Sequence, residues 1–409
     1  MVVVALVVRF GSAATFSLVL ALPAAGRVTA PFVQSTKAEQ TAIPFGASTV
    51  AADLYRPAHP RGAILLVHGL SPAGRRQPDL ARLAELLARH GQLALVPQFE
   101  GLAAFRLDGT EVSAVVAALD HAARLASPVA IAGFSFGAGP ALLAAAERPR
   151  IRLAGSFGGY ADLRSVIAFV TTSAAPEPYN RWKLLQLLAG FAENPVDRSR
   201  LDAIGQVKLA DPSADTTQME AMLGADGRSV LALVYNRRPD ALDGLLARLS
   251  PGARAALDRL SPLPAMARLR GRVLIAHGRA DISIPYTESV RLAEGARTRA
   301  VILSTFHHTG PLSPLELVRA GRVEAARAGR CPAERREPLT PLGYTVRCAR
   351  EGWTVAGRGN AAGGKSGLRR AGCWVTPRGG NPTDQCHRKE TAVSSSLRGW
   401  RGGKGETVR

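Results

Sequence analysis

The feature that most constrains this chain is an alternation of short apolar runs with segments of helical periodicity between about residues 48 and 310. The runs RGAILLVH at 61–68 and PVAIAGF at 128–134 are continuous, which is typical of strands buried on both faces of a parallel sheet. Between them, leucines recur at helical spacing over residues 80–87. Strands that alternate with helices predict an α/β fold with a doubly wound, mostly parallel sheet.

The alternation is interrupted once. Residues 160–270 have mainly helical patterns with breaks at proline and glycine, which predicts a helical cap insertion between two parts of the sheet domain, 34–159 and 271–330. In such sheets ligands bind beyond the carboxyl ends of the strands, so we look for chemistry just after each apolar run. The strands that we expect lie at 49–55, 61–68, 93–99, 128–134, 151–157, 272–276 and 299–306.

The N-terminus has the pattern of a targeting segment. Residues 2–25 are almost wholly apolar, and small residues at Ala24-Ala25-Gly26 offer a cleavage site for an export signal. The apolar stretch is short for a membrane span of about 20 residues. We therefore treat residues 1–33 as a signal peptide or N-terminal anchor and predict an exported or membrane-anchored protein. A buried N-terminal element and a cytoplasmic location are the alternatives.

The charge of the chain is concentrated near its end. The net charge is +20, and residues 311–409 contribute 19 of the 52 basic and 8 of the 32 acidic residues. Residues 331–409 lack a sustained strand or helix period and hold all four cysteines without a CxxC pair, which predicts a basic, disordered tail without a metal site. Because no nucleic-acid-binding motif appears, we predict no specific nucleic-acid partner and at most weak contact of the tail with anionic surfaces. Binding of nucleic acid or anionic lipid by the tail is the competing hypothesis.

The motif GFSFG at 133–137 stands where a predicted strand meets a predicted helix. A serine on such a sharp turn needs a strained backbone, and a Cβ at either flanking position would clash with the neighbouring chain. The motif therefore predicts a nucleophile elbow with Ser135 as the nucleophile and Gly133 and Gly137 as the elbow glycines. An ordinary glycine-rich turn is the alternative interpretation.

A second turn, His68-Gly69-Leu70-Ser71, follows the apolar run at 61–68. Such a turn is expected beside the elbow, where the backbone N–H groups of Leu70 and Phe136 could hold the oxyanion of an acyl-transfer reaction. We expect His68 to shape this loop rather than to transfer protons.

A candidate acid and a candidate base follow two later strands. Asp281 lies in HGRADISIP, and an acid there can fix and stabilise a catalytic imidazolium. Asp162, after the preceding strand, is the reserve candidate. His307 and His308 follow the last strand. Since adjacent side chains point in different directions, only one histidine can face the serine, and we favour His308.

These motifs together resemble those of the α/β-hydrolase family. The similarity rests on VHGL at 67–70, GFSFG, HGRADISIP and the FHH histidine pair, and it spans about residues 48–310. Bacterial lipases, esterases and serine-aminopeptidase-like hydrolases are the most similar branch. The resemblance implies Ser135 as nucleophile, Asp281 as acid and His308 as base, no cofactor, and a cap formed by the helical insertion.

The implied reaction is acyl transfer from a small-molecule acyl substrate to water through an acyl-enzyme. We favour a carboxylesterase. An aminopeptidase-type amide hydrolase and a non-catalytic binding protein on a hydrolase fold are the alternatives, and the sequence makes no prediction of the oligomeric state.

Overall fold

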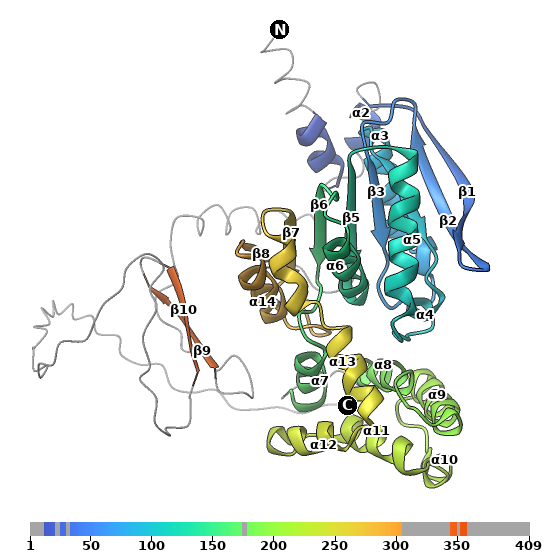
Figure 1. Ribbon diagram of the computed structural model, residues 1–409, viewed down its shortest axis with the longest axis vertical. Helices are drawn as coiled ribbons and strands as arrows, with labels where there is room; N and C mark the ends of the chain where they lie inside the picture. Colours follow the sequence, from blue (N-terminus) through green and yellow to red (C-terminus); the bar gives the residue numbers. More distant parts are fainter. Residues whose placement is uncertain are drawn as a thin grey trace, which may run out of the picture. The chain divides into compact units, whose positions relative to one another are not determined.

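A computed structural model of the chain describes residues 12–20, 25–29, 33–173 and 178–304 and the backbone of two strands near the C-terminus. Within this part, eight strands form one sheet in the order β1-β2-β4-β3-β5-β6-β7-β8 (Figure 1). Strand β2 runs antiparallel to both of its neighbours, and the other adjacent pairs are parallel. The predicted mostly parallel sheet with helices between its strands is therefore confirmed. The strands are β1 (Thr36–Phe45), β2 (Ser48–Pro57), β3 (Ala63–Val67), β4 (Leu93–Pro97), β5 (Val129–Phe134), β6 (Leu153–Phe157), β7 (Val273–Gly278) and β8 (Ala300–Leu303).

The strand β1 was not among those that the sequence predicts. It forms a hairpin with β2 that is paired along its whole length, and Gly46 at the turn has a φ of 58°. Half of the residues in its sequence TKAEQTAIPF are polar, and Ile43 is the one residue of the strand that is buried. Charged side chains on an edge strand discourage pairing with other chains, and they also hide the apolar pattern by which a buried strand is recognised.

Helices cover both faces of the sheet, because alternate residues of each strand point to opposite faces. On β3, Leu66 packs in one cluster with Leu80 of α3, whereas Leu65 and Val67 belong to a larger cluster with α5 and α6. The helices of this part are α2 (Gly26–Thr29), η3 (Gly74–Arg76), α3 (Pro78–Arg89), α4 (Glu100–Ala103), α5 (Thr110–Leu125), η4 (Ser135–Gly137), α6 (Ala138–Glu147) and α14 (Tyr286–Ala296).

Between β6 and β7, every described element is helical, over the stretch where the sequence predicts an insertion (Figure 1). The side chain of Arg181 is fully buried there and donates hydrogen bonds to the carbonyl oxygens of Thr171, Val234 and Asn236, so one guanidinium ties three helices together. The helices are α7 (Leu163–Thr172), α8 (Pro178–Ala189), α9 (Pro195–Ala210), α10 (Thr217–Ala221), α11 (Ala225–Tyr235), η5 (Pro239–Ala241), α12 (Leu242–Arg248), α13 (Pro251–Arg259) and η6 (Leu263–Leu269).

The two ends of the chain are described in part. Residues 12–20 are helical, and Ser12 and Phe16 contact the ring of His90. Among the residues described, no helix has both the length and the hydropathy that crossing a membrane requires. In the predicted tail, β9 (Tyr344–Ala349) and β10 (Gly352–Gly357) form an antiparallel pair that the sequence pattern does not predict. The remaining tail residues lie outside the described part.

Candidate active site

The backbone at Ser135 is strained. This residue directly follows β5, at the start of the turn into α6, and its φ of 51° lies in the left-handed region. Non-glycine residues seldom adopt this conformation, which costs on the order of 1–3 kcal/mol and occurs preferentially at functional sites. The surrounding chain must hold the serine in this position.

The glycines on both sides of Ser135 show how the chain holds it. A Cβ placed on Gly133 would lie 2.5 Å from the Cα of Ala138, and one on Gly137 would lie 2.1 Å from the carbonyl oxygen of His68. Both neighbours are backbone atoms, which cannot move aside as a side chain can. The structure thus gives a direct steric reason for glycine at both positions of GFSFG.

The turn after β3 lies against the serine. Strands β3 and β5 are adjacent and parallel, with Val67 opposite Gly133, so their carboxyl ends meet at one edge of the sheet. A Cβ on Gly69 would lie 2.9 Å from the Cβ and 3.4 Å from the Oγ of Ser135. The turn that carries Leu70 and the turn that carries Phe136 are therefore brought together. The role of their two N–H groups as oxyanion donors stays a prediction.

The buried imidazole of His68 connects this turn to the next strand end. Its Nε2 accepts a hydrogen bond from the backbone N–H of Phe99 at 3.1 Å, and its Nδ1 lies 2.8 Å from the carbonyl oxygen of Gly69. Since Nε2 accepts, Nδ1 carries the proton. Burial lowers the pKa of His68, which favours this neutral form. These contacts agree with a loop-shaping role.

The carboxylate of Asp281 is held on both oxygens. Its Oδ1 accepts hydrogen bonds from the backbone N–H groups of Ser283 and Ile284 at 2.8 and 2.9 Å, and its Oδ2 lies 3.1 Å from the Nε2 of His277. The His277 ring is buried, and its Nδ1 is 2.7 Å from the hydroxyl of Ser289. His277 is not among the residues that the sequence motifs predict for the site, although it lies four residues before Asp281 in HGRADISIP.

The reserve acid, Asp162, belongs to a different network at the start of the insertion. Its Oδ1 accepts a hydrogen bond from the backbone N–H of Arg164 at 2.9 Å and so caps helix α7, and its Oδ2 lies 3.3 Å from Arg291. The same Arg291 pairs with the buried Glu288. The structure thereby gives Asp162 a role in capping and ion pairing.

The candidate bases, His307 and His308, lie outside the residues that the structure describes. The strand that precedes them, β8, is placed: it pairs in parallel with β7, and Leu303 lies opposite Gly278. The carboxyl end of β8 therefore lies beside the carboxyl end of β7, which is followed by the loop that carries Asp281.

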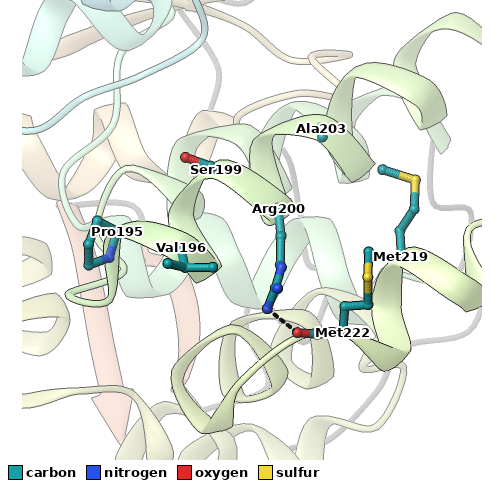
Figure 2. A pocket seen from close by; sticks show the side chains of 7 residues that line it. All are labelled: Pro195, Val196, Ser199, Arg200, Ala203, Met219 and Met222. Atoms are coloured by element: carbon teal, nitrogen blue, oxygen red, sulfur yellow. Dashed lines mark hydrogen bonds between the residues drawn. The ribbon is translucent and has the colours of Figure 1, made fainter.

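An apolar pocket of about 460 Å³ lies within the helical insertion, and none of the predicted site residues lines it. Figure 2 shows the guanidinium of Arg200 pointing toward Met222, to whose carbonyl oxygen it donates a hydrogen bond. The pocket is lined by Pro195, Val196, Ser199, Arg200, Ala203, Met219 and Met222.

No group of three or more histidine, cysteine, aspartate or glutamate side chains in the described part of the chain could hold a metal ion.

Comparison with protein-family models and with curated protein sequences finds no match. Solved structures with similar coordinates include an acylaminoacyl peptidase from Pyrococcus horikoshii, with a TM-score of 0.45 and 13% identity over 74% of this chain and 43% of that one. Another is a puromycin-hydrolyzing peptidase from Mycobacterium tuberculosis, with a TM-score of 0.41 and 19% identity over 72% of this chain and 39% of that one. A third is an esterase domain from Rhodothermus marinus, with a TM-score of 0.40 and 16% identity over 71% of this chain and 98% of that one. The chain thus spans less than half the length of the two peptidases.

Proposed function

We propose that this protein is a serine hydrolase that cleaves a carboxylic ester of a small-molecule acyl substrate. The observation that carries the proposal is Ser135, a non-glycine residue with a φ of 51° between two glycines that tolerate no Cβ. Of the three non-glycine residues with a positive φ in the described part of the chain, Ser135 is the one that directly follows a central strand of the sheet. A nucleophile that must project from a tight turn supplies a reason for this conformation.

In the proposed reaction, Ser135 attacks the ester carbonyl while its hydroxyl proton passes to His308. The N–H groups of Leu70 and Phe136 hold the negative charge that develops on the carbonyl oxygen. The leaving alcohol takes the proton from His308, and an acyl-serine forms. Water then gives a proton to His308 and attacks the acyl-serine; as the bond between the acyl carbon and Oγ breaks, His308 returns the proton to Oγ, which releases the acid and restores Ser135.

The role of Asp281 is to accept a hydrogen bond from the base and to stabilise its charged form. A carboxylate does this well when it is itself oriented. The two backbone N–H groups and the His277 ring that contact Asp281 support this assignment, because together they restrict rotation of the carboxylate.

The proposal is tested by labelling the purified full-length protein with a fluorophosphonate probe and mapping the modified peptide. We expect the label on Ser135 and its loss in Ser135→Ala. A matched control is Ser113→Ala, since Ser113 is an exposed serine on α5. Absence of labelling in folded wild-type protein, together with absence of hydrolysis of short p-nitrophenyl esters, would overturn the proposal.

Two comparisons refine the assignment. His308→Ala should abolish hydrolysis, whereas His307→Ala should retain it, and the reverse result would exchange their roles. Parallel rates on p-nitrophenyl esters of increasing acyl length and on aminoacyl p-nitroanilides then measure whether esters are preferred over amides.

A further inference from the structure

We infer that Asn180, on helix α8 of the insertion, is a positioning residue for the catalytic acid, so that the insertion takes part in the chemistry of the site. The inference rests on the proposed function, since it takes Asp281 as the acid. It concerns a side chain that is far from Asp281 in the sequence and reaches the residues directly after it.

Asn180 makes two hydrogen bonds to neighbouring residues of the loop 279–285 between β7 and α14, which carries Asp281 and is called the acid loop here. Its Nδ2 donates to the carbonyl oxygen of Ile282 at 3.0 Å, and its Oδ1 accepts from the hydroxyl of Ser283 at 3.2 Å. The amide is buried, at 8% exposure. A single side chain therefore satisfies a donor and an acceptor on consecutive residues and restricts the path of the loop there.

One of these residues also holds the acid. The backbone N–H of Ser283 donates to Oδ1 of Asp281 at 2.8 Å, so the residue that Asn180 holds by its side chain holds Asp281 by its backbone. The other carboxylate oxygen, Oδ2 of Asp281, lies beside the Nε2 of His277, and the same nitrogen also contacts the carbonyl oxygen of Ile284. The acid is thus held by the sheet domain through His277 and by the insertion through Asn180.

Within this loop, Ile284 is fully buried, whereas Ile282 faces solvent. The side chain of Ile282 is 59% exposed, so burial of this residue does little to fix the loop. Its carbonyl group is held from the insertion side instead. Helix α8 is in turn fixed by the neighbouring Arg181, whose guanidinium binds carbonyl groups at the ends of α7 and α11. A displacement of these helices would move the support of the acid.

The consequence for catalysis is specific. Loss of Asn180 should let the carboxylate of Asp281 turn away from the base, which weakens stabilisation of the imidazolium without removing any group that binds substrate. We expect kcat to fall by about 10-fold and KM to change by less than about 2-fold, since a misplacement near 1 Å at a catalytic group costs up to about 100-fold. A less well stabilised imidazolium also shifts the acidic limb of the kcat/KM profile to lower pH.

The experiment compares four full-length variants with wild type: Asn180→Ala, Asn180→Asp, Ser283→Ala and Asn236→Ala. The last is a matched control, because Asn236 is an equally buried asparagine of the insertion whose side chain bonds both backbone polar groups of Arg238 instead of the acid loop. Asn180→Asp keeps the shape and the acceptor but loses the donor to Ile282. Labelling rate at Ser135, kcat, KM, the pH profile and the melting temperature are measured for each.

The expected result is that both Asn180 variants lose kcat and shift the pH profile, that Ser283→Ala shows a smaller change in the same direction, and that Asn236→Ala changes the melting temperature alone. Equal kcat and pH profiles for the folded Asn180 variants and Asn236→Ala would overturn the inference. Should the Asn180 variants not fold, an unchanged kcat in Ser283→Ala would overturn it as well. Failure of wild type to label at Ser135 would instead refute the proposed function.

Discussion

The substitution Gly137→Ala gives the most direct test of the elbow. The added Cβ would lie 2.1 Å from the carbonyl oxygen of His68 and 2.8 Å from that of Val67, whereas real Cβ atoms essentially never approach closer than 3.0 Å. The His68 carbonyl would have to move by about 0.9 Å to relieve the contact. Both oxygens belong to the backbone at the end of a central strand, so no rotation of a side chain removes the clash.

The magnitude follows from this geometry. Overpacking in a filled core costs about 1–3 kcal/mol, and we expect the upper end here, about 3 kcal/mol, because the displaced atoms are backbone. The displaced turn carries Leu70, a proposed oxyanion donor. A shift approaching 1 Å there should also slow labelling of Ser135 by about 100-fold.

The assay pairs denaturant unfolding with the fluorophosphonate labelling rate. The control is Gly244→Ala, at an exposed position within helix α12 where an added Cβ meets nothing within 4 Å. Alanine there should stabilise the helix by up to about 1 kcal/mol, because glycine is a poorer helix former. The steric explanation of the elbow is wrong if the free energy of unfolding of Gly137→Ala lies within about 1 kcal/mol of the wild-type value and Ser135 is labelled at the wild-type rate.

Three further predictions test other parts of the account. Ser135→Gly should be more stable than Ser135→Ala by about 1 kcal/mol in denaturant unfolding, because glycine adopts a positive φ without strain; equal stabilities would contradict the strain. The pKa of the buried His68 is lowered, so the unfolded chain takes up a proton first as the pH falls through 6.5. The free energy of unfolding is therefore full above pH 6.5 and falls toward pH 5, with at most about 1.4 kcal/mol per pH unit coming from this residue. When unfolding is measured at several pH values, His68→Gln should lose less stability per pH unit than wild type; an equal dependence on pH in the two proteins would contradict this role of His68. Glu288→Gln should destabilise the protein by about 1–3 kcal/mol in thermal or denaturant unfolding, because the amide oxygen can still accept from the N–H groups of Ala161 and Asp162 but the amide nitrogen, a donor, would face the guanidinium of Arg291, which now lies 2.9 Å from Oε1. The control Glu85→Gln, in an exposed ion pair with Arg89, should cost less than about 0.5 kcal/mol, and an equal cost for the two variants would refute the role of Glu288.

The order of elements was largely predictable from local patterns. Continuous apolar runs such as 128–134 indicate buried parallel strands, because both faces of such a strand are covered by helices. The edge strand β1 was missed for the converse reason, since Ile43 is its one buried residue and a single buried side chain leaves no apolar pattern. The strand order, in which β4 lies between β2 and β3, depends on contacts between distant segments and is not encoded in any local pattern.

The sequence by itself determined which residue types stand at the strand ends: a serine between glycines, an HG turn and an aspartate four residues after a histidine. The reason is that strand ends and turns are set by short-range sterics, which a local pattern records. Only the tertiary structure decided how these ends act on one another. It set the φ of Ser135, brought Gly69 against that serine and joined Asn180 of the insertion to the loop of Asp281. Such contacts join residues that the chain separates by up to about a hundred positions, and they form only when the sheet and the insertion pack.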